Sequence, residues 1–300
     1  MKVVILGKGV MLANLIEGTI QSGAEIVGVM RYEKMTHTPL QLLFHDFFST
    51  SPELTLIKKY HLHEINAKSA NSKEFRRELL RLNADVLLVG TWREKIQKAT
   101  YDIPTLASIN VHPSLLPAYR GPNPYMQTIK HGEKFSGVTF HLIDQNLDTG
   151  AILAQKKVEI LNCDTGKELR EKTVYAARLL LPELLNRLEN GLIQPIRQNE
   201  KLASYYPNIS PDEIMLNFRE KTAQEIHNHI RALHPWLPCY IQYGKNFYIP
   251  DPYRLKIVPQ THASAGAILA RKQNSITVVC KDGNALEMSN LKKYHHKIFK

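Results

Sequence analysis

The sequence predicts an α/β fold: a Rossmann-like, mainly parallel sheet with helices on both faces, followed by a smaller C-terminal OB-like β-barrel domain. Over residues 1–150, short apolar runs rich in β-branched residues alternate with helical patterns, as repeated β-α-β units do. Beyond residue 200, the chain changes to short strand-like runs separated by prolines and other turn residues, which is typical of a small barrel. We therefore expect a first domain over residues 1–199 and a second over residues 200–300.

Strands and helices of the first domain are expected to alternate along the chain. Strands are predicted at Val3–Leu6, Glu25–Met30, Asp85–Val89, Ala107–His112, Val138–Ile143 and Ala151–Glu159. Helices are predicted at Met11–Gln21, at Ser72–Leu82 with Ser72 as the N-cap, and near Tyr125–His131. The third of these strands is apolar throughout its centre, as expected when helices cover both faces of a parallel sheet.

A long helix is predicted next, and after it the sequence pattern changes to short strands. Thr165 and Glu168 have the spacing of a capping box, which predicts a helix running to about Asn190, where Gly191 would end it. In the second domain, one helix is expected at Ala223–Leu233. Short strands are then predicted at Tyr240–Tyr243, Phe247–Ile249, Ala267–Leu269, Ser275–Cys280 and Leu286–Met288.

The composition indicates a globular protein of the cytosol. Of the 300 residues, 43% are apolar and 22% are charged, which is normal for a chain with a packed core. No stretch approaches the roughly 20 apolar residues that cross a bilayer, so no membrane partner is expected. The first apolar run is too short for a signal peptide. The three cysteines, Cys163, Cys239 and Cys280, are far apart and form no disulfide framework, which fits a cytoplasmic location.

The charge is concentrated at the end of the chain. The net charge is +11, and residues 201–300 contain 14 Lys and Arg against 7 Asp and Glu, which gives this part +7. A basic domain favours a polyanionic partner, with nucleic acid as the first candidate. Net charge that only aids solubility is the alternative.

Gly7-Lys8-Gly9 lies between the first predicted strand and helix, where a dinucleotide-binding fingerprint would begin. The third glycine of that fingerprint would stand at position 12, which is occupied by Leu12. We therefore interpret the segment as a tight turn between strand and helix.

Asn110 and His112 are the first candidates for a functional site. Side chains two positions apart on a strand share a face, so both point the same way. They stand near the end of a strand that leads into a loop, where α/β sheets place their ligands. Two polar side chains on an otherwise apolar strand are costly to bury unless they are paired.

A second segment supplies acids that could pair with them. The predicted strand Val138–Ile143 ends in a turn that carries Asp144 and Asp148, and one of these could reach the imidazole of His112. Asn110 offers amide donors, His112 a donor that can be charged, and Asp148 an acid to orient it. A tetrahedral intermediate at a carbonyl carbon needs such an oxyanion stabiliser and proton acceptor.

The residues alone leave a simpler alternative open, in which these polar groups only cap the strand ends. A serine hydrolase is not indicated, because Ser114 lacks the Gly-x-Ser-x-Gly elbow.

Together, the two segments resemble the signature of the folate-dependent formyltransferase family, which includes glycinamide ribonucleotide, methionyl-tRNA and nucleotide amino-sugar formyltransferases. That signature combines an Asn-x-His pair, a Ser-Leu-Leu-Pro loop with Tyr-Arg-Gly, and a Gly-Val-Thr-x-His strand ending in Asp-x-Gly. Its elements stand here at Asn110/His112, Ser114–Pro117, Tyr119–Gly121, Gly137–His141 and Asp148–Gly150.

The resemblance implies a direct transfer of a formyl group to an amine. Asn110 and protonated His112 would stabilise the oxyanion, while Asp148 would hold the imidazole and, through water, take the amine proton. His141 is interpreted as a residue of the core. No metal is required.

The implied co-substrate is 10-formyltetrahydrofolate, in a cleft lined by the end of one strand, the loop after the Asn-x-His pair and the acidic turn. The implied contacts are Leu88, Gly90, Trp92, Arg93, Ser114, Leu115, Leu116, Pro117 and Asp144. For Leu115 and Leu116, a role as anchors of the loop is the alternative.

The resemblance extends beyond the first domain. Gln198-Asn199-Glu200, Ala203-Ser204-Tyr205 and His234-Pro235-Trp236 are similar to the junction between the two domains of methionyl-tRNA and amino-sugar formyltransferases. The C-terminal domain in that family is a small OB-like barrel.

The acceptor has two main candidates. The amino group of methionyl-tRNA fits the chain length and the basic second domain, because phosphate contacts dominate affinity for nucleic acid. Arg31–Thr38 instead runs into the apolar Leu40–Phe48, a possible amphipathic helix, where methionyl-tRNA formyltransferases carry a basic, glycine-containing insert. Asn217-Phe218 and Leu237-Pro238 also depart from the usual Asp-Trp and Pro-Gly.

These departures keep a nucleotide-linked amino sugar, or another small amine, as the alternative acceptor. A third hypothesis is a non-catalytic relative that binds folate or RNA. It is disfavoured because Asn110, His112 and Asp148 are all present.

Overall fold

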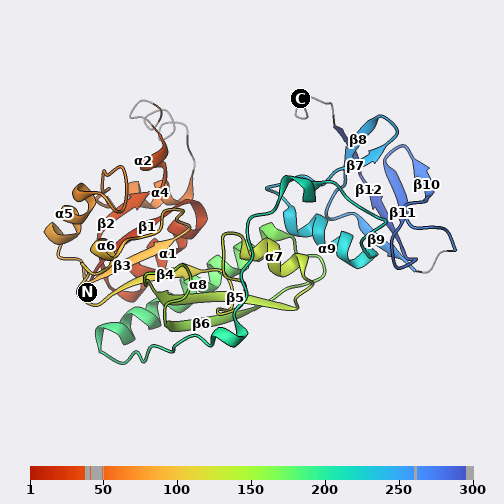
Figure 1. Ribbon diagram of the computed structural model, residues 1–300. Helices are drawn as coiled ribbons and strands as arrows, with labels where there is room; N and C mark the ends of the chain where they lie inside the picture. Colours follow the sequence, from red (N-terminus) through yellow and green to blue (C-terminus); the bar gives the residue numbers. More distant parts are fainter. Residues whose placement is uncertain (38–40, 42–48, 50, 260–261, 295–300) are drawn as a thin grey trace. The chain divides into compact units, whose positions relative to one another are not determined.

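A computed structural model describes residues 1–37, 41, 49, 51–259 and 262–294. The chain forms two compact units, each assembled from separate stretches (Figure 1). Unit 1 consists of Met1–Gly121, Ser136–Val158 and Glu171–Tyr205, and unit 2 of Pro122–Phe135, Glu159–Arg170 and Tyr206–Lys300. The boundary expected between residues 199 and 200 remains a prediction.

Unit 1 is built on a sheet with the strand order β2-β1-β3-β4-β5-β6. The strands are β1 (Lys2–Gly7), β2 (Glu25–Arg31), β3 (Val86–Gly90), β4 (Ala107–His112), β5 (Phe135–Leu142) and β6 (Ile152–Glu159). From β2 to β4 the neighbours are parallel, whereas β5 runs antiparallel to β4. The predicted, mainly parallel sheet is therefore confirmed, with its strands within a few residues of their expected bounds.

Helices cover both faces of this sheet. Along β1, Val3 and Ile5 belong to a buried cluster with α1 (Gly9–Ser22) and α8 (Gly166–Glu189). The alternate residues Val4 and Leu6 belong to a second cluster with α5 (Lys73–Arg81). Because successive side chains of a strand point to opposite faces, burial of all four residues requires cover on both sides.

The helix ends follow the expected chemistry in part. The side chain of Ser72 accepts a hydrogen bond from the Phe75 backbone N–H, so it caps α5 as predicted. At the start of α8, the Glu168 carboxylate accepts from the Thr165 N–H at 2.9 Å, but the Thr165 hydroxyl accepts from Lys167 rather than from Glu168. Only one half of the predicted capping box is therefore formed. The short helices α2 (Glu33–Thr36), α4 (Pro52–Lys59) and α6 (Lys98–Tyr101) were missed.

The Gly7–Gly9 segment forms the turn from β1 into α1. Gly9 has a left-handed φ of +58°, and a Cβ atom on Gly7 would lie 2.7 Å from the Gly90 carbonyl oxygen. The Gly9 N–H donates to the carboxylate of Glu53, so the protein itself supplies an anion at the start of α1. The interpretation as a turn agrees with this geometry.

The described part of unit 2 contains α-helices and two antiparallel sheets. α7 (Pro124–Lys130) packs against α9 (Ala223–Leu233), and α9 is capped by the reciprocal pair Thr222 and Glu225. One sheet has the order β10-β11-β12-β9 and the other β13-β8-β7. Their strands are β7 (Ile241–Tyr243), β8 (Asn246–Ile249), β9 (Leu255–Val258), β10 (Ile268–Lys272), β11 (Ser275–Val279), β12 (Ala285–Ser289) and β13 (Lys292–Tyr294).

Short antiparallel strands in the last third are therefore confirmed, although β9 and β13 were missed.

Two further expectations concern a possible helix and membrane-spanning segments. The possible helix at Leu40–Phe48 lies outside the described residues, apart from Gln41. Within the described ranges, no helix is both long and apolar enough to cross a bilayer.

Candidate active site

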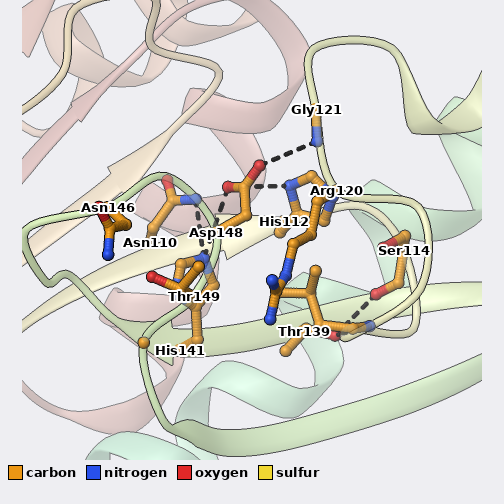
Figure 2. A network of polar contacts seen from close by, with 12 residues as sticks. Asn110, His112, Ser114, Arg120, Gly121, Thr139, His141, Asn146, Asp148 and Thr149 are labelled. Atoms are coloured by element: carbon orange, nitrogen blue, oxygen red, sulfur yellow. Dashed lines mark hydrogen bonds and ion pairs between the residues drawn. The ribbon is translucent and has the colours of Figure 1, made fainter. Parts of the chain in front are cut away.

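Three polar side chains converge at the carboxyl end of β4 in unit 1. Asn110 and His112 occupy one face of that strand, and β5 leads into the turn 143–150, which carries Asp148 back toward them (Figure 2). The Nδ1 atom of His112 lies 3.4 Å from Oδ1 of Asp148. The sequence placed these three residues in one site, and the structure brings them together.

Asp148 is held in an unusual backbone conformation. Its φ is +59°, in the left-handed region that L-residues seldom adopt. Its Oδ2 atom accepts a hydrogen bond of 3.0 Å from the Gly121 N–H. Burial raises the pKa of the carboxyl, but the charge and hydrogen bond of His112, together with the Gly121 N–H, outweigh it and lower the pKa to about 2. Asp148 is therefore a carboxylate at neutral pH.

His112 is buried, with oxygen acceptors beside both ring nitrogens. Its Nε2 atom lies 2.9 Å from the carbonyl oxygen of Tyr119, and Nδ1 faces Asp148. The imidazole is thus fixed from two sides. To donate a hydrogen bond to a bound molecule, it must exchange the Tyr119 contact for that molecule.

His141 is buried, as its interpretation as a core residue expects, and it also contacts the candidate site, which the sequence analysis did not anticipate. In the antiparallel register of β4 and β5 it pairs with Asn110, and its Nε2 atom lies 3.1 Å from the Asn110 amide nitrogen. Burial, followed by the charge of His112, lowers the pKa of His141 to about 4 against the attraction of Asp148. The neutral ring then donates from Nδ1 to the Leu142 carbonyl at 2.8 Å and accepts from Asn110 at Nε2.

This arrangement orients the Asn110 amide. One of its hydrogens is directed at His141, and its second hydrogen remains for another acceptor. The sequence signal for His141 was its place at the end of the Gly-Val-Thr-x-His element. Its contact with Asn110 depends on the pairing register of β5, which the sequence does not reveal.

The loop after β4 is tied to the two neighbouring strands. Ser114 donates from its hydroxyl to the Ala118 carbonyl at 2.8 Å. The Thr139 hydroxyl donates to the Ser114 carbonyl and accepts from the Leu116 N–H. Gln155 of β6 donates to the Leu116 carbonyl at 2.7 Å and to Thr139 at 2.8 Å. The hydroxyl of Ser114 and the main chain of Leu116 therefore anchor this loop.

The other residues named for the co-substrate occupy different settings. Gly90 ends β3 beside Val111 of β4, so the stretch that follows it begins next to the polar cluster. Leu88 is fully buried in the core, and Arg93 is exposed. Leu115 and Pro117 are half-buried. The indole N–H of Trp92 is buried and has no hydrogen-bond partner in the described part of the chain.

Asp144, the second acid of the turn, does not approach His112 in the way that Asp148 does. Its carboxylate accepts from the Asn146 N–H at 3.0 Å and from the Thr149 hydroxyl at 2.8 Å. It therefore closes the turn 144–149 from within, and the acid that pairs with His112 is Asp148. Across the ranges that the structure describes, no group of three or more His, Cys, Asp and Glu residues could hold a metal ion.

Known protein families match both the N-terminal and the C-terminal part of the chain. A family model described as formyl transferase matches residues 1–185, and one described as formyl transferase, C-terminal domain, matches residues 208–300. A methionyl-tRNA formyltransferase of Enterococcus faecalis is 29% identical over 97% of this chain and 90% of the relative. One from a Geobacillus species is 30% identical over 78% of this chain and 73% of the relative.

Solved structures agree on the fold. An N-formyltransferase from Helicobacter canadensis, in complex with folinic acid and dTDP-3-aminofucose, superposes with a TM-score of 0.71 at 22% identity. The match covers 98% of this chain and 100% of that one.

Proposed function

Because the chain belongs to the formyl transferase family, we propose that it transfers a formyl group from 10-formyltetrahydrofolate to the amino group of methionyl-tRNA. The observation that carries the reaction is the meeting of Asn110, His112 and Asp148 at the carboxyl end of β4. Donors and a carboxylate around one point suit a carbonyl carbon that passes through a tetrahedral state.

Each group has a distinct part in this reaction. The acceptor nitrogen forms a bond to the formyl carbon, and the bond from that carbon to the folate nitrogen breaks, so negative charge develops on the formyl oxygen in between. The Asn110 amide donates its second hydrogen to this oxygen, since the first is held by His141. His112 adds a second donor once its contact to the Tyr119 carbonyl is exchanged.

Asp148 acts mainly through its charge. A carboxylate with a pKa of about 2 is a weak base at neutral pH, so it would not retain the amine proton. It orients the imidazole of His112 and stabilises positive charge on the attacking nitrogen, while water carries the proton to the departing folate nitrogen. This assignment needs no covalent intermediate on the protein.

The folate, which supplies the formyl group, has suitable partners beside β4. The unpartnered indole N–H of Trp92 offers a donor for a polar heterocycle, and the backbone of Gly90–Arg93 continues from the strand next to Asn110. Leu115, Leu116 and Pro117 would form the apolar side. Leu88 and Asp144 would contribute through the main chain, because their side chains are packed or bonded within the protein.

Relatives and charge favour tRNA as the acceptor. The Enterococcus faecalis relative matches nearly the whole chain, and residues 201–300 carry 14 basic against 7 acidic side chains. A nucleotide-linked amino sugar is the second candidate, favoured by the dTDP-3-aminofucose bound to the Helicobacter canadensis enzyme. We also propose a cytoplasmic location, an OB-like barrel for the antiparallel strands of unit 2, and a boundary between the two domains at residues 199 and 200.

One assay separates the acceptors. The protein is incubated with 10-formyltetrahydrofolate and either methionine-charged initiator tRNA or a panel of nucleotide amino sugars, and the formylated product is quantified by mass spectrometry. Formyl transfer to the tRNA, with an affinity that falls steeply as salt rises, supports the proposal. Transfer to an amino sugar alone, with little dependence on salt, would replace the tRNA by the second candidate.

A further inference from the structure

We infer that Gln198 is a positioning residue for Asp148, holding the backbone of the acidic turn so that the carboxylate stays between His112 and Gly121. This inference rests on the proposed function, because it assigns Asp148 a part in formyl transfer. Gln198 lies in the segment that follows α8 and is separated from Asp148 by 50 positions of sequence.

The amide nitrogen of Gln198 binds the acidic turn at two points. It donates to the carbonyl oxygen of Asp148 at 2.9 Å and to that of Gly150 at 2.8 Å. The residue is only 5% exposed; its bond to Gly150 is shielded from water and its bond to Asp148 is partly shielded. A single side chain thus fixes the carbonyl groups of Asp148 and Gly150, the two neighbours of Thr149.

The other end of the amide is fixed by an arginine. The Gln198 oxygen accepts from Arg120, at 2.8 Å from Nη2 and 3.3 Å from Nε. Arg120 also donates two bonds to the Glu200 carboxylate, at 2.9 Å and 2.8 Å. Because the guanidinium only donates, it forces the amide oxygen toward itself and the amide N–H groups toward the turn.

These contacts form a closed ring around Asp148. Arg120 precedes Gly121, whose N–H binds the Asp148 carboxylate. The same short stretch therefore reaches the carboxylate directly and the Asp148 carbonyl by way of Gln198. The backbone and the side chain of the acid are held by one connected network.

Asp148 needs such support because its backbone is strained. A left-handed φ is unfavourable for an L-residue, so the turn would relax if its carbonyl bonds were lost. Relaxation would move the carboxylate away from the groups that face it, which are the imidazoles of His112 and His141, the Gly121 N–H and, electrostatically, Arg120. A small displacement of such a group lowers the rate strongly.

The kinetic test uses two substitutions and one control. Gln198→Met keeps the size and removes the donors without adding charge, and Gln198→Glu keeps an acceptor for Arg120 while removing the donors. Gln194→Glu, at an exposed position of the same segment, is the matched control. We expect kcat to fall by roughly 10- to 100-fold in both Gln198 variants, with KM changed less than threefold and the control unaffected.

A titration separates positioning from a general loss of stability. The carboxyl carbons of the protein are labelled with ¹³C, and the Asp148 signal is assigned by its disappearance in Asp148→Asn. In Gln198→Met, the pKa of Asp148 should rise, because His112 and the Gly121 N–H no longer hold the carboxylate. Thermal unfolding is recorded in parallel.

Three results would overturn the inference: unchanged kcat in both variants, a fall in kcat that follows only the folded fraction, or an unchanged Asp148 titration. The titration needs no substrate. If the native protein showed no formyl transfer, the proposed function would fail, while the link between Gln198 and Asp148 would still be tested.

Discussion

Asn110 donates to a neutral histidine, and this contact decides what its amide can do for a substrate. His141 accepts one amide hydrogen, so the remaining one has a fixed direction and needs no rearrangement when charge develops on a substrate oxygen. Hydrogen-bond donors held in place in this way stabilise the developing negative charge more than flexible donors do, because their orientation is fixed before the reaction begins.

Replacement of Asn110 by Ala is therefore expected to lower kcat by about 10²- to 10³-fold, the usual effect of removing one oxyanion donor. Steady-state kinetics with 10-formyltetrahydrofolate and the acceptor measure this effect. Asn190→Ala, at an exposed position at the end of α8, is the control. Near-normal turnover of Asn110→Ala would contradict the assignment.

His141 links stability to pH. The pKa of His141 is about 4 in the folded protein and 6.5 in the unfolded chain. Between these two pH values, the unfolded chain binds a proton at His141 and the folded chain does not. Stability should therefore be fully present above about pH 6.5 and fall as the pH drops toward 4. The loss amounts to about 3 kcal/mol.

In His141→Asn this loss is absent. The stability gap between the native protein and the variant should shrink by about 3 kcal/mol from pH 7 to pH 4, in urea unfolding curves followed by circular dichroism. A gap that stays constant over this range would show that His141 is not held neutral by burial.

At the scale of the elements, the turn between β5 and β6 depends on the absence of a side chain at Gly150. A Cβ atom there would lie 1.8 Å from the carbonyl oxygen of Leu142, which is backbone and cannot rotate away. The turn packs against the end of β5, where the Leu142 N–H donates to the Ala151 carbonyl. This close approach brings Asp148 over β4.

Gly150→Ala should therefore displace the turn, lower kcat at least 10-fold and destabilise the protein by about 1–3 kcal/mol or more. Gly191→Ala provides the comparison, because that glycine has a φ of +67° and no neighbour within 4 Å of an added Cβ. Gly191→Ala should lower the free energy of unfolding by about 1–2 kcal/mol and leave kcat unchanged. Equal kinetics in the two variants would refute the role of close packing.

The elements that could be predicted from sequence are those with a strong local signal. β1, β3 and β4 are apolar runs between turns, and α9 has both a capping pair and an apolar face, so their bounds were found within one or two residues. The short α6 and the polar β13 lack such signals. Their conformation depends on neighbours far away in sequence.

The same distinction holds within the site. Asn110 and His112 could be identified because they alternate with apolar residues on a predicted strand. Asp148 could be identified because it begins the Asp-x-Gly element of the family signature. His141 and Gln198 lie in segments that resemble the family, but their contacts with Asn110 and Asp148 depend on strand register and on a loop 50 positions away, which no local pattern reveals. Sequence patterns therefore found the polar groups at the strand ends but not the contacts that orient them.

At the scale of the whole molecule, unit 2 is not one continuous stretch of chain. The segments Pro122–Phe135 and Glu159–Arg170 belong to it together with the residues from Tyr206 onward. Arg231 of α9 is 5% exposed and donates to the carbonyls of Leu161 and Asp164. A fragment that begins at residue 206 lacks the segment that contains those acceptors.

We therefore expect the fragment 206–300 to unfold at a lower temperature than the intact chain. Arg231→Met should destabilise the intact protein more than the fragment, because only the intact protein loses the bonds to the carbonyls of Leu161 and Asp164, whereas the bond to Asn228 is lost in both. Differential scanning calorimetry measures both effects. An equal loss of stability in the two contexts would exclude this account.

The fixed loop from Ser114 to Ala118 has a consequence for the rate at which a ligand arrives. Main-chain groups of this loop are already bonded to Thr139 and Gln155. The loop therefore does not have to become ordered when the folate binds against it as proposed. Binding there should lose little conformational entropy and proceed in a single fast step. In a stopped-flow trace, association would then rise linearly with ligand concentration rather than level off at the rate of a loop closure.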